Sequence, residues 1–213
     1  MTPFQASKKT AELCRMAPVI PVLVVEDPAH ARPLAEALVA GGLPVLEVTL
    51  RTPAALEVIA EMATVKGGIV GAGTVLCPDD AYAAKDAGAR FAVTPGCTSR
   101  LLDAVEDAGL PTLPGAATPS EVLSLLEQGY SVQKFFPAEI NGGIAALKAI
   151  GAPMPQVTFC PTGGVSATNA PDYLALPNVA CVGGSWVAPK ALVEAGDWGA
   201  ITDLARAAAA LGR

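Results

Sequence analysis

Residues 44–72 read PVLEVTLRTPAALEVIAEMATVKGGIVGA and contain, in order, an apolar run, a Thr-Pro turn, a helical stretch and a second apolar run. The first run, Pro44–Leu50, is rich in β-branched and apolar residues, which is typical of a strand. Thr52-Pro53 predicts a helix start, because threonine can cap a helix whose first residue is proline. Gly67-Gly68 predicts the helix end, and Ile69–Ala72 the next strand. This segment therefore predicts one strand–helix–strand unit.

The same alternation continues along all 213 residues. Eight apolar runs are each separated from the next by enough residues for one helix. The runs are Val19–Val25, Pro44–Leu50, Ile69–Ala72, Phe91–Thr94, Pro111–Leu113, Ser131–Phe136, Gln156–Cys160 and Val179–Val182. Eight such units predict an α/β protein, a single (β/α)8 TIM barrel over residues 1–213. An N-terminal helix over Thr2–Ala17 is expected to cover the bottom of the barrel.

An open, doubly wound sheet is the alternative fold, because alternation of strands and helices does not by itself show closure. That fold commonly binds a dinucleotide through a G-x-G-x-x-G turn. The nearest match, Gly71-Ala72-Gly73, lacks the third glycine, and no such turn opens the first helix. We therefore prefer the barrel and expect no cofactor.

Further helix boundaries support the alternation. Asp27-Pro28 predicts a second capped helix start, and Thr118-Pro119-Ser120-Glu121 predicts a capping box, in which threonine and glutamate cap each other's backbone. Glycines that fall where helices should end are Gly41-Gly42, Gly67-Gly68, Gly88, Gly109, Gly129 and Gly151.

Composition excludes several classes of protein. Hydrophobic residues make up 52% of the chain and charged residues 16%, whereas a disordered chain has few apolar groups and much charge. The net charge is −6 and the Lys and Arg residues are scattered, so no nucleic-acid partner is expected. The apolar stretches are far shorter than the ~20 residues that span a bilayer, so no membrane partner is expected either.

Histidine and cysteine narrow the chemistry further. A single histidine, His30, excludes a site built from several histidine ligands, and no metal is expected. The five cysteines include no C-x-x-C pair and predict reduced thiols. No signal peptide is recognisable near Met1, so a cytoplasmic location is expected.

Charged side chains in the second apolar run are the first candidates for chemistry. Alternation over residues 45–51 places three aliphatic residues on one face and Glu47 and Arg51 on the other. The aliphatic face should pack against helices, so Glu47 and Arg51 are expected in the barrel mouth, where barrel enzymes carry their active sites. The alternative is structural: an ion pair for a buried Glu47, and a surface cation for Arg51.

The sixth apolar run contains Lys134, which is the one lysine of the chain inside a predicted strand. Beside Phe135 and Phe136, its charged form is disfavoured, which leaves neutral amine that can attack a carbonyl. The alternative is a structural pair with Glu47. Even that pair would put a base beside an amine, as Schiff-base chemistry requires.

Two glycine-rich turns follow the last two predicted strands, at Pro161–Val165 and Gly183–Ser185. In such barrels phosphate often binds between these two loops, on backbone N–H groups. Glycine lets the backbone approach an anion closely, and Ser185 adds a hydroxyl donor. Either turn alone could be purely structural, but the two together predict a phosphate site.

Seven motifs occur in a characteristic order. They are Gly42-Leu43 with Glu47–Arg51, then Gly71–Val75, Thr94–Gly96, Pro114–Glu121, Lys134–Glu139, Cys160–Gly164 and Gly183–Trp186. With them the chain, over Pro18–Gly196, resembles the 2-dehydro-3-deoxy-6-phosphogluconate aldolases, a class I family that also often accepts 4-hydroxy-2-oxoglutarate.

The resemblance implies a role for each matching residue. Lys134 would form the Schiff base and Glu47 would transfer protons. Arg51 and Thr74 would hold the pyruvate carboxylate. The residues that would shape the pocket are Pro95, Thr162 and Phe136, and those that would receive the phosphate are Gly163, Gly164, Gly184 and Ser185. Gln133 departs from the family pattern, which is apolar there, and is expected to make a packing adjustment or an interface contact.

The implied reaction cleaves a phosphorylated 2-keto-3-deoxy sugar acid to pyruvate and glyceraldehyde 3-phosphate in the Entner–Doudoroff pathway. The resemblance also implies a homo-oligomer, a trimer. Three alternatives stay open: an aldolase for the galactonate epimer, a phosphate-binding barrel isomerase or synthase without a Schiff base, and an inactive carrier of a sugar acid.

Overall fold

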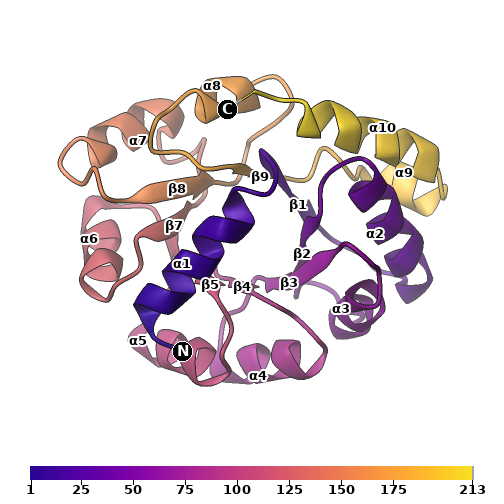
Figure 1. Cartoon of the computed structure of the whole chain (residues 1–213), viewed down its shortest axis with the longest axis horizontal. Helices are drawn as coiled ribbons and strands as arrows, with labels where there is room; N and C mark the ends of the chain where they lie inside the picture. Colours follow the sequence, from indigo (N-terminus) through magenta and orange to yellow (C-terminus); the bar gives the residue numbers. More distant parts are fainter. Residues whose placement is uncertain (213) are drawn as a thin grey trace.

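The computed structural model describes residues 1–212, over which strands and helices alternate (Figure 1). The strands within this range are β1 (Val19–Leu23), β2 (Val45–Thr49), β3 (Ile69–Gly73), β4 (Ala92–Val93), β5 (Thr112–Leu113), β6 (Gly115–Ala116), β7 (Val132–Phe135), β8 (Thr158–Pro161) and β9 (Val182–Gly184). The helices are α1 (Pro3–Cys14), α2 (Ala31–Ala40), α3 (Ala55–Ala63), α4 (Pro78–Asp86), α5 (Ser99–Asp107), α6 (Pro119–Glu127), α7 (Gly143–Gly151), α8 (Ala170–Leu174), α9 (Lys190–Glu194) and α10 (Trp198–Ala209), with a short 3-10 helix η1 (Pro28–His30). In Figure 1, helices α2–α10 surround the strands and α1 passes across them.

The strands pair in parallel throughout the described range. One sheet has the order β5–β4–β3–β2–β1–β9 and the other the order β6–β7–β8. Parallel neighbours need a crossover connection, and the intervening helices supply it. The predicted α/β class with a parallel, curled sheet is confirmed.

The structure corrects two strand predictions. The run at Pro111–Leu113 is followed, after Pro114, by a further short strand, β6, which pairs with β7 whereas β5 pairs with β4. The last strand lies later than predicted, because Gly183 and Gly184 belong to β9 and pair with β1, while Val179 forms only an isolated bridge with Phe159. Glycine has a low strand propensity, so this pairing depends on the neighbouring backbone of β1.

The predicted helix caps have mixed outcomes. The Thr118 capping box is confirmed, since its hydroxyl accepts from Glu121 N and the Glu121 carboxylate accepts from Thr118 N. Asp27 caps η1 rather than an α-helix, by accepting from Ala29 N at 2.9 Å. The prediction for Thr52 is wrong: α3 begins at Ala55, and the Thr52 hydroxyl instead donates to Val25 O at 2.8 Å.

The strands separate two groups of apolar side chains. Leu46 and Val48 of β2 lie in the large core between strands and helices, as predicted from the period of two. Val45, on the opposite face, belongs to a second buried cluster with one residue from each of five other strands, namely Ile20, Val93, Leu113, Val132 and Cys160. Phe91 and Cys181, each directly before a strand, also belong to it. Cys14 of α1 completes this cluster.

Helix α1 is fixed to the ends where β5 and β7 begin. The Ser7 hydroxyl accepts from Ser131 N at 2.9 Å and from Val132 N at 3.0 Å. The Thr10 hydroxyl donates to Thr112 O at 3.2 Å. These contacts leave the opposite, carboxyl-terminal ends of the strands for a site. No helix in residues 1–212 combines the length and the apolar character needed to cross a membrane.

Candidate active site

The buried Lys134–Glu47 pair is the centre of the site. Lys134 on β7 and Glu47 on β2 are 87 residues apart in the chain, yet Nζ lies 3.4 Å from Oε1. Their side chains are only 6% and 3% exposed. Burial of an unpaired charge is costly, so each side chain compensates the charge of the other. A base therefore lies beside an amine, which is the pairing that the sequence analysis gave as the structural alternative for Lys134.

Two neighbours shape the space around this pair. The Phe136 ring lies beneath the amine, with its centroid 4.9 Å from Lys134 Nζ. Gly73, the last residue of β3, leaves the space that Glu47 fills, since a Cβ there would lie 2.3 Å from Oε1. Sequence reasoning included Gly73 in a motif but missed this role. Its only signal was a glycine at the end of a strand, and its partner across the sheet is Thr49 rather than Glu47.

Arg51 and Thr74 occupy the turns that follow β2 and β3. Arg51 is exposed, and its Nε donates to Thr49 Oγ1 at 3.1 Å. The Thr49 hydroxyl in turn donates to Leu23 O at 2.9 Å, which holds the end of β2 against β1. Thr74 is half-buried and has a φ of +58°, a left-handed conformation that is costly for a β-branched residue.

Pro95 and Gly115 lie where β4 and β6 approach each other. Pro95 is half-buried, directly after β4 and Thr94. A Cβ on Gly115 would lie 2.4 Å from the Pro95 carbonyl, so glycine is required for this approach. Gly115 N donates to Thr94 Oγ1 at 3.2 Å, which fixes the two segments together.

The two glycine-rich segments lie side by side after β8 and in β9. Thr162 is buried and forms a parallel bridge with Gly183, where a Cβ would lie 2.3 Å from Thr162 Oγ1. Gly163 and Gly164 follow with φ values of +96° and +81°. Gly184 is buried, and Ser185 next to it is exposed. The four predicted phosphate residues thus lie on two adjoining segments.

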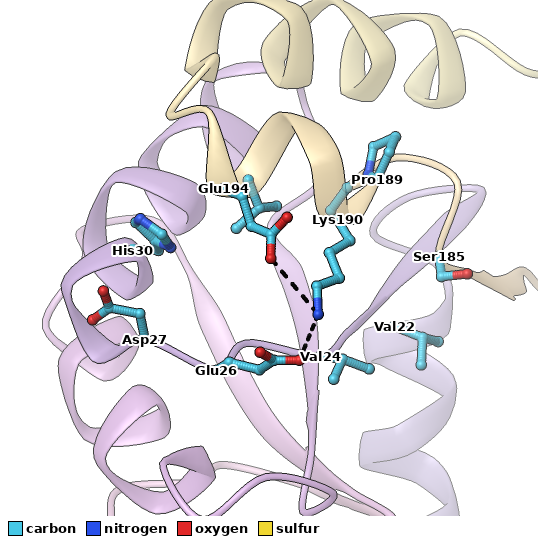
Figure 2. Close-up of a pocket in the computed structure, with 11 residues that line it drawn as sticks. Val22, Val24, Glu26, Asp27, His30, Ser185, Pro189, Lys190 and Glu194 are labelled. Carbon is cyan, nitrogen blue, oxygen red and sulfur yellow. Dashed lines mark hydrogen bonds and ion pairs between the residues drawn. The ribbon is translucent and has the colours of Figure 1, made fainter.

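A cavity of about 510 Å³ opens beside Ser185 (Figure 2). Its wall includes Val22, whose neighbour on β2 is Glu47. Lys190 Nζ reaches into this region and pairs with Glu26 at 2.8 Å and Glu194 at 3.6 Å. Neither Lys134 nor Glu47 lines it.

Gln133 makes a packing adjustment, which is one of the two outcomes expected from its departure from the family pattern. Its side chain is buried on the face opposite Lys134, and Nε2 donates to Tyr130 O at 2.8 Å and Val122 O at 3.1 Å. Its Oε1 has no hydrogen-bond partner among the described residues. His30 lines the cavity beside Ser185, and its ring lies 5.8 Å from that of Trp198.

The chain is similar in sequence and in structure to known aldolases. The family model described as KDPG and KHG aldolase matches residues 10–204. A 2-dehydro-3-deoxy-phosphogluconate aldolase of Pseudoalteromonas atlantica is 56% identical over 91% of this chain and 90% of its own. The solved Zymomonas mobilis ZM4 2-keto-3-deoxy-6-phosphogluconate aldolase, with 3-phosphoglycerate, is 49% identical with a TM-score of 0.92, covering 97% of this chain and 98% of its own.

A further solved relative is the KDPG aldolase of Legionella pneumophila, in which pyruvate was captured as a covalent carbinolamine intermediate. It is 47% identical with a TM-score of 0.91, and the match covers 94% of this chain and 98% of that one. A family model over most of the chain, together with relatives near 50% identity, shows the family. The chain belongs to the KDPG and KHG aldolases.

Proposed function

We propose that this enzyme, a Schiff-base lyase, cleaves 2-dehydro-3-deoxy-6-phosphogluconate (KDPG) to pyruvate and glyceraldehyde 3-phosphate, with Lys134 as the Schiff-base residue. The observation that carries the assignment is the buried Lys134–Glu47 pair, with 3.4 Å between amine and carboxylate. An amine beside a proton acceptor is what carbinolamine and imine formation need.

The first half of the reaction forms the imine. Lys134 passes its proton to Glu47, and the neutral amine then attacks the C2 carbonyl. Glu47 returns this proton to the hydroxyl of the resulting carbinolamine, which leaves as water. The protonated imine that remains withdraws electrons from the C3–C4 bond. Covalent catalysis of this kind replaces one difficult step with several easier ones.

The second half breaks the carbon–carbon bond. The Glu47 carboxylate takes the C4 hydroxyl proton, the C3–C4 bond breaks, and its electrons move into the imine to give an enamine. Glyceraldehyde 3-phosphate leaves. Protonation of the enamine carbon and hydrolysis of the imine then release pyruvate and restore Lys134.

The remaining predicted residues bind the two ends of the substrate. Arg51 and Thr74 hold the carboxylate beside C2, and Phe136, Pro95 and Thr162 form the walls of the pocket. The phosphate is received by Gly163, Gly164, Gly184 and Ser185. The parallel bridge between Thr162 and Gly183 supports this assignment, because it keeps the two phosphate-binding segments together.

The strands form one closed (β/α)8 barrel in this proposal. Pro114 alone separates β5 from β6, so the pairing passes from β4 to β7. Ala180 N donates to Phe159 O at 3.0 Å, and Thr162 bridges Gly183, which supports closure between β8 and β9. Slow hydrogen exchange at Ala180 N–H is expected, and exchange as fast as in an exposed loop would contradict closure.

Substrate range, assembly and location extend the proposal. The enzyme also cleaves 4-hydroxy-2-oxoglutarate, since the family includes KHG aldolases. Comparing the cleavage rate of KDPG with that of its galactonate epimer decides between the two sugar acids.

We expect the chain to form one barrel domain and to assemble as a homotrimer in the cytoplasm. Light scattering in solution checks the assembly, and a monomeric mass would contradict it.

Borohydride trapping with pyruvate tests the assignment. The expected result is a mass increase on a peptide containing Lys134, and none in Lys134→Met. Lys148→Met is the matched control, because Lys148 is exposed on α7, and it should be trapped like the wild type. An adduct on another lysine, or no adduct at all, would overturn the assignment.

A further inference from the structure

Glu139 and Tyr173 form a hydrogen-bonded pair beside the Gly163–Gly164 segment. Glu139 lies in the turn between β7 and α7, and Tyr173 lies in α8 with its side chain fully buried. The Tyr173 hydroxyl donates to Glu139 Oε1. Burial, together with this bond to a carboxylate, raises the pKa of Tyr173 well above its usual value, so the hydroxyl stays a proton donor at any working pH.

Glu139 contacts the glycine segment through its backbone and through its side chain. Glu139 N donates to Gly163 O at 3.1 Å, and next to it Ala138 N donates to Thr162 O at 2.8 Å. A Cβ on Gly164 would lie 2.5 Å from Glu139 Cγ. The segment therefore packs directly on the aliphatic part of the Glu139 side chain.

The N-terminal end of helix α8 holds the same segment through a second set of hydrogen bonds. Asn169, just before α8, donates from Nδ2 to Gly164 O at 3.1 Å, and its Oδ1 accepts from Ser166 N at 2.7 Å. Tyr173 belongs to this helix and reaches across to Glu139. The glycine segment thus contacts two supports, Glu139 and the start of α8, and the Tyr173–Glu139 bond joins them. Gly143 leaves room for the bond, since a Cβ there would lie 2.9 Å from the Tyr173 hydroxyl.

We propose that Tyr173 and Glu139 are positioning residues that hold the backbone N–H groups of Gly163 and Gly164 in place for the phosphate of the substrate. The inference rests on the proposed phosphate role of these glycines. Glycine with positive φ is free to adopt many conformations, so an unsupported segment would lose entropy on binding. The pair reduces that loss. It acts on the phosphate end and leaves the chemistry at Lys134 unaffected.

Tyr173→Phe tests this, because it removes only the hydroxyl. The expected result is a KM for KDPG about tenfold higher, as the loss of one hydrogen bond to a charged group predicts. Competitive inhibition by inorganic phosphate should weaken by a similar factor. The rate of borohydride trapping with pyruvate, which has no phosphate, should stay within twofold of the wild type.

Tyr130→Phe is the matched control. Tyr130 is also fully buried, and its hydroxyl also donates to a glutamate, Glu106, at 3.0 Å. Within residues 1–212, Tyr130 makes no hydrogen bond to Gly163 or Gly164, so the KM of Tyr130→Phe for KDPG should not change. Equal KM values in the two variants, or a loss of pyruvate trapping in Tyr173→Phe as large as its rise in KM, would overturn the inference.

Glu139 provides a second test should Tyr173→Phe fail to fold. Glu139→Ala should raise KM about tenfold, whereas Glu139→Gln keeps an acceptor for Tyr173 and should recover to within about threefold. Equal effects of the two variants on KM would contradict the inference.

The amide chemical shifts of Gly163 and Gly164 can be followed while the protein is titrated with inorganic phosphate, a measurement that requires no catalysis. This titration therefore tests the inference even if the wild type neither traps pyruvate nor cleaves KDPG. That second result is the one that would refute the proposed function itself.

Discussion

Single residues show how narrow the space around the catalytic pair is. Lys134 and Glu47 stood out in the sequence because charges are rare in apolar strands. Gly73 did not stand out, because its need for a missing Cβ comes from the Glu47 side chain on the neighbouring strand. A sequence pattern along one strand contains no information about the side chains across from it. The glycine is therefore as specific to the site as the charged residues, yet only the structure reveals it.

Gly73→Ala is expected to displace the Glu47 carboxylate and to lower kcat by about 10²-fold, the lower end of what positioned proton transfer contributes. Steady-state cleavage of KDPG measures this. Gly68→Ala is the control, since its Cβ would lie 3.5 Å or more from its neighbours and its φ is not positive. A wild-type kcat in Gly73→Ala would show that Glu47 has room to move.

At the scale of elements, the helices follow local signals where no distant partner competes. The Thr118 box is confirmed because its donors and acceptors all lie within four residues. Thr52 carries the same kind of signal, yet its hydroxyl bonds to Val25 O instead of starting a helix. Local capping is therefore predictable only when the capping side chain is not used elsewhere.

Thr118→Ala is expected to lower the free energy of unfolding by about 1 kcal/mol, the usual effect of losing an N-cap. Urea unfolding measures the change. Ser120→Ala, at an exposed position in the same helix, is the control and should change stability far less. No loss in Thr118→Ala would mean that packing alone defines the start of α6.

The same box makes a prediction about pH. Hydrogen bonds from the backbone, above all from Ala117 N, lower the pKa of Glu121. A carboxylate with a lowered folded-state pKa stabilises the protein above its unfolded pKa of about 4.3, and this contribution disappears as the pH falls through the folded value. The stability difference between wild type and Glu121→Gln should therefore be present at pH 7 and shrink below about pH 4. A difference that does not depend on pH would contradict this.

At the scale of the whole molecule, α1 connects the start of the chain to strands more than a hundred residues away. The Ser7 hydroxyl accepts from two backbone N–H groups at the start of β7, which would otherwise lack partners under the helix. This end of the molecule is thereby closed, and the site lies at the other end. The sequence predicted a helix here and its covering position, but Ser7 carried no signal of its own.

Ser7→Ala should lower the free energy of unfolding by about 2 kcal/mol, because it leaves buried donors without an acceptor. Thermal unfolding should show a drop in Tm of about 4–8 °C for a chain of this size. Ser99→Ala, at an exposed position in α5, serves as the control. An unchanged Tm in Ser7→Ala would mean that water replaces the hydroxyl.

The sequence by itself determined the α/β class, the order of strands and helices, most element positions and the candidate residues, because these depend on short-range patterns of apolar, charged and capping side chains. Tertiary structure alone decided that β6 exists, that Gly183 and Gly184 form a strand, and that Thr52 is not a cap. It also decided that Gly73 and Gly164 must be glycines. Each of these depends on hydrogen bonds or atomic contacts with residues far away in the chain, and no local preference encodes them.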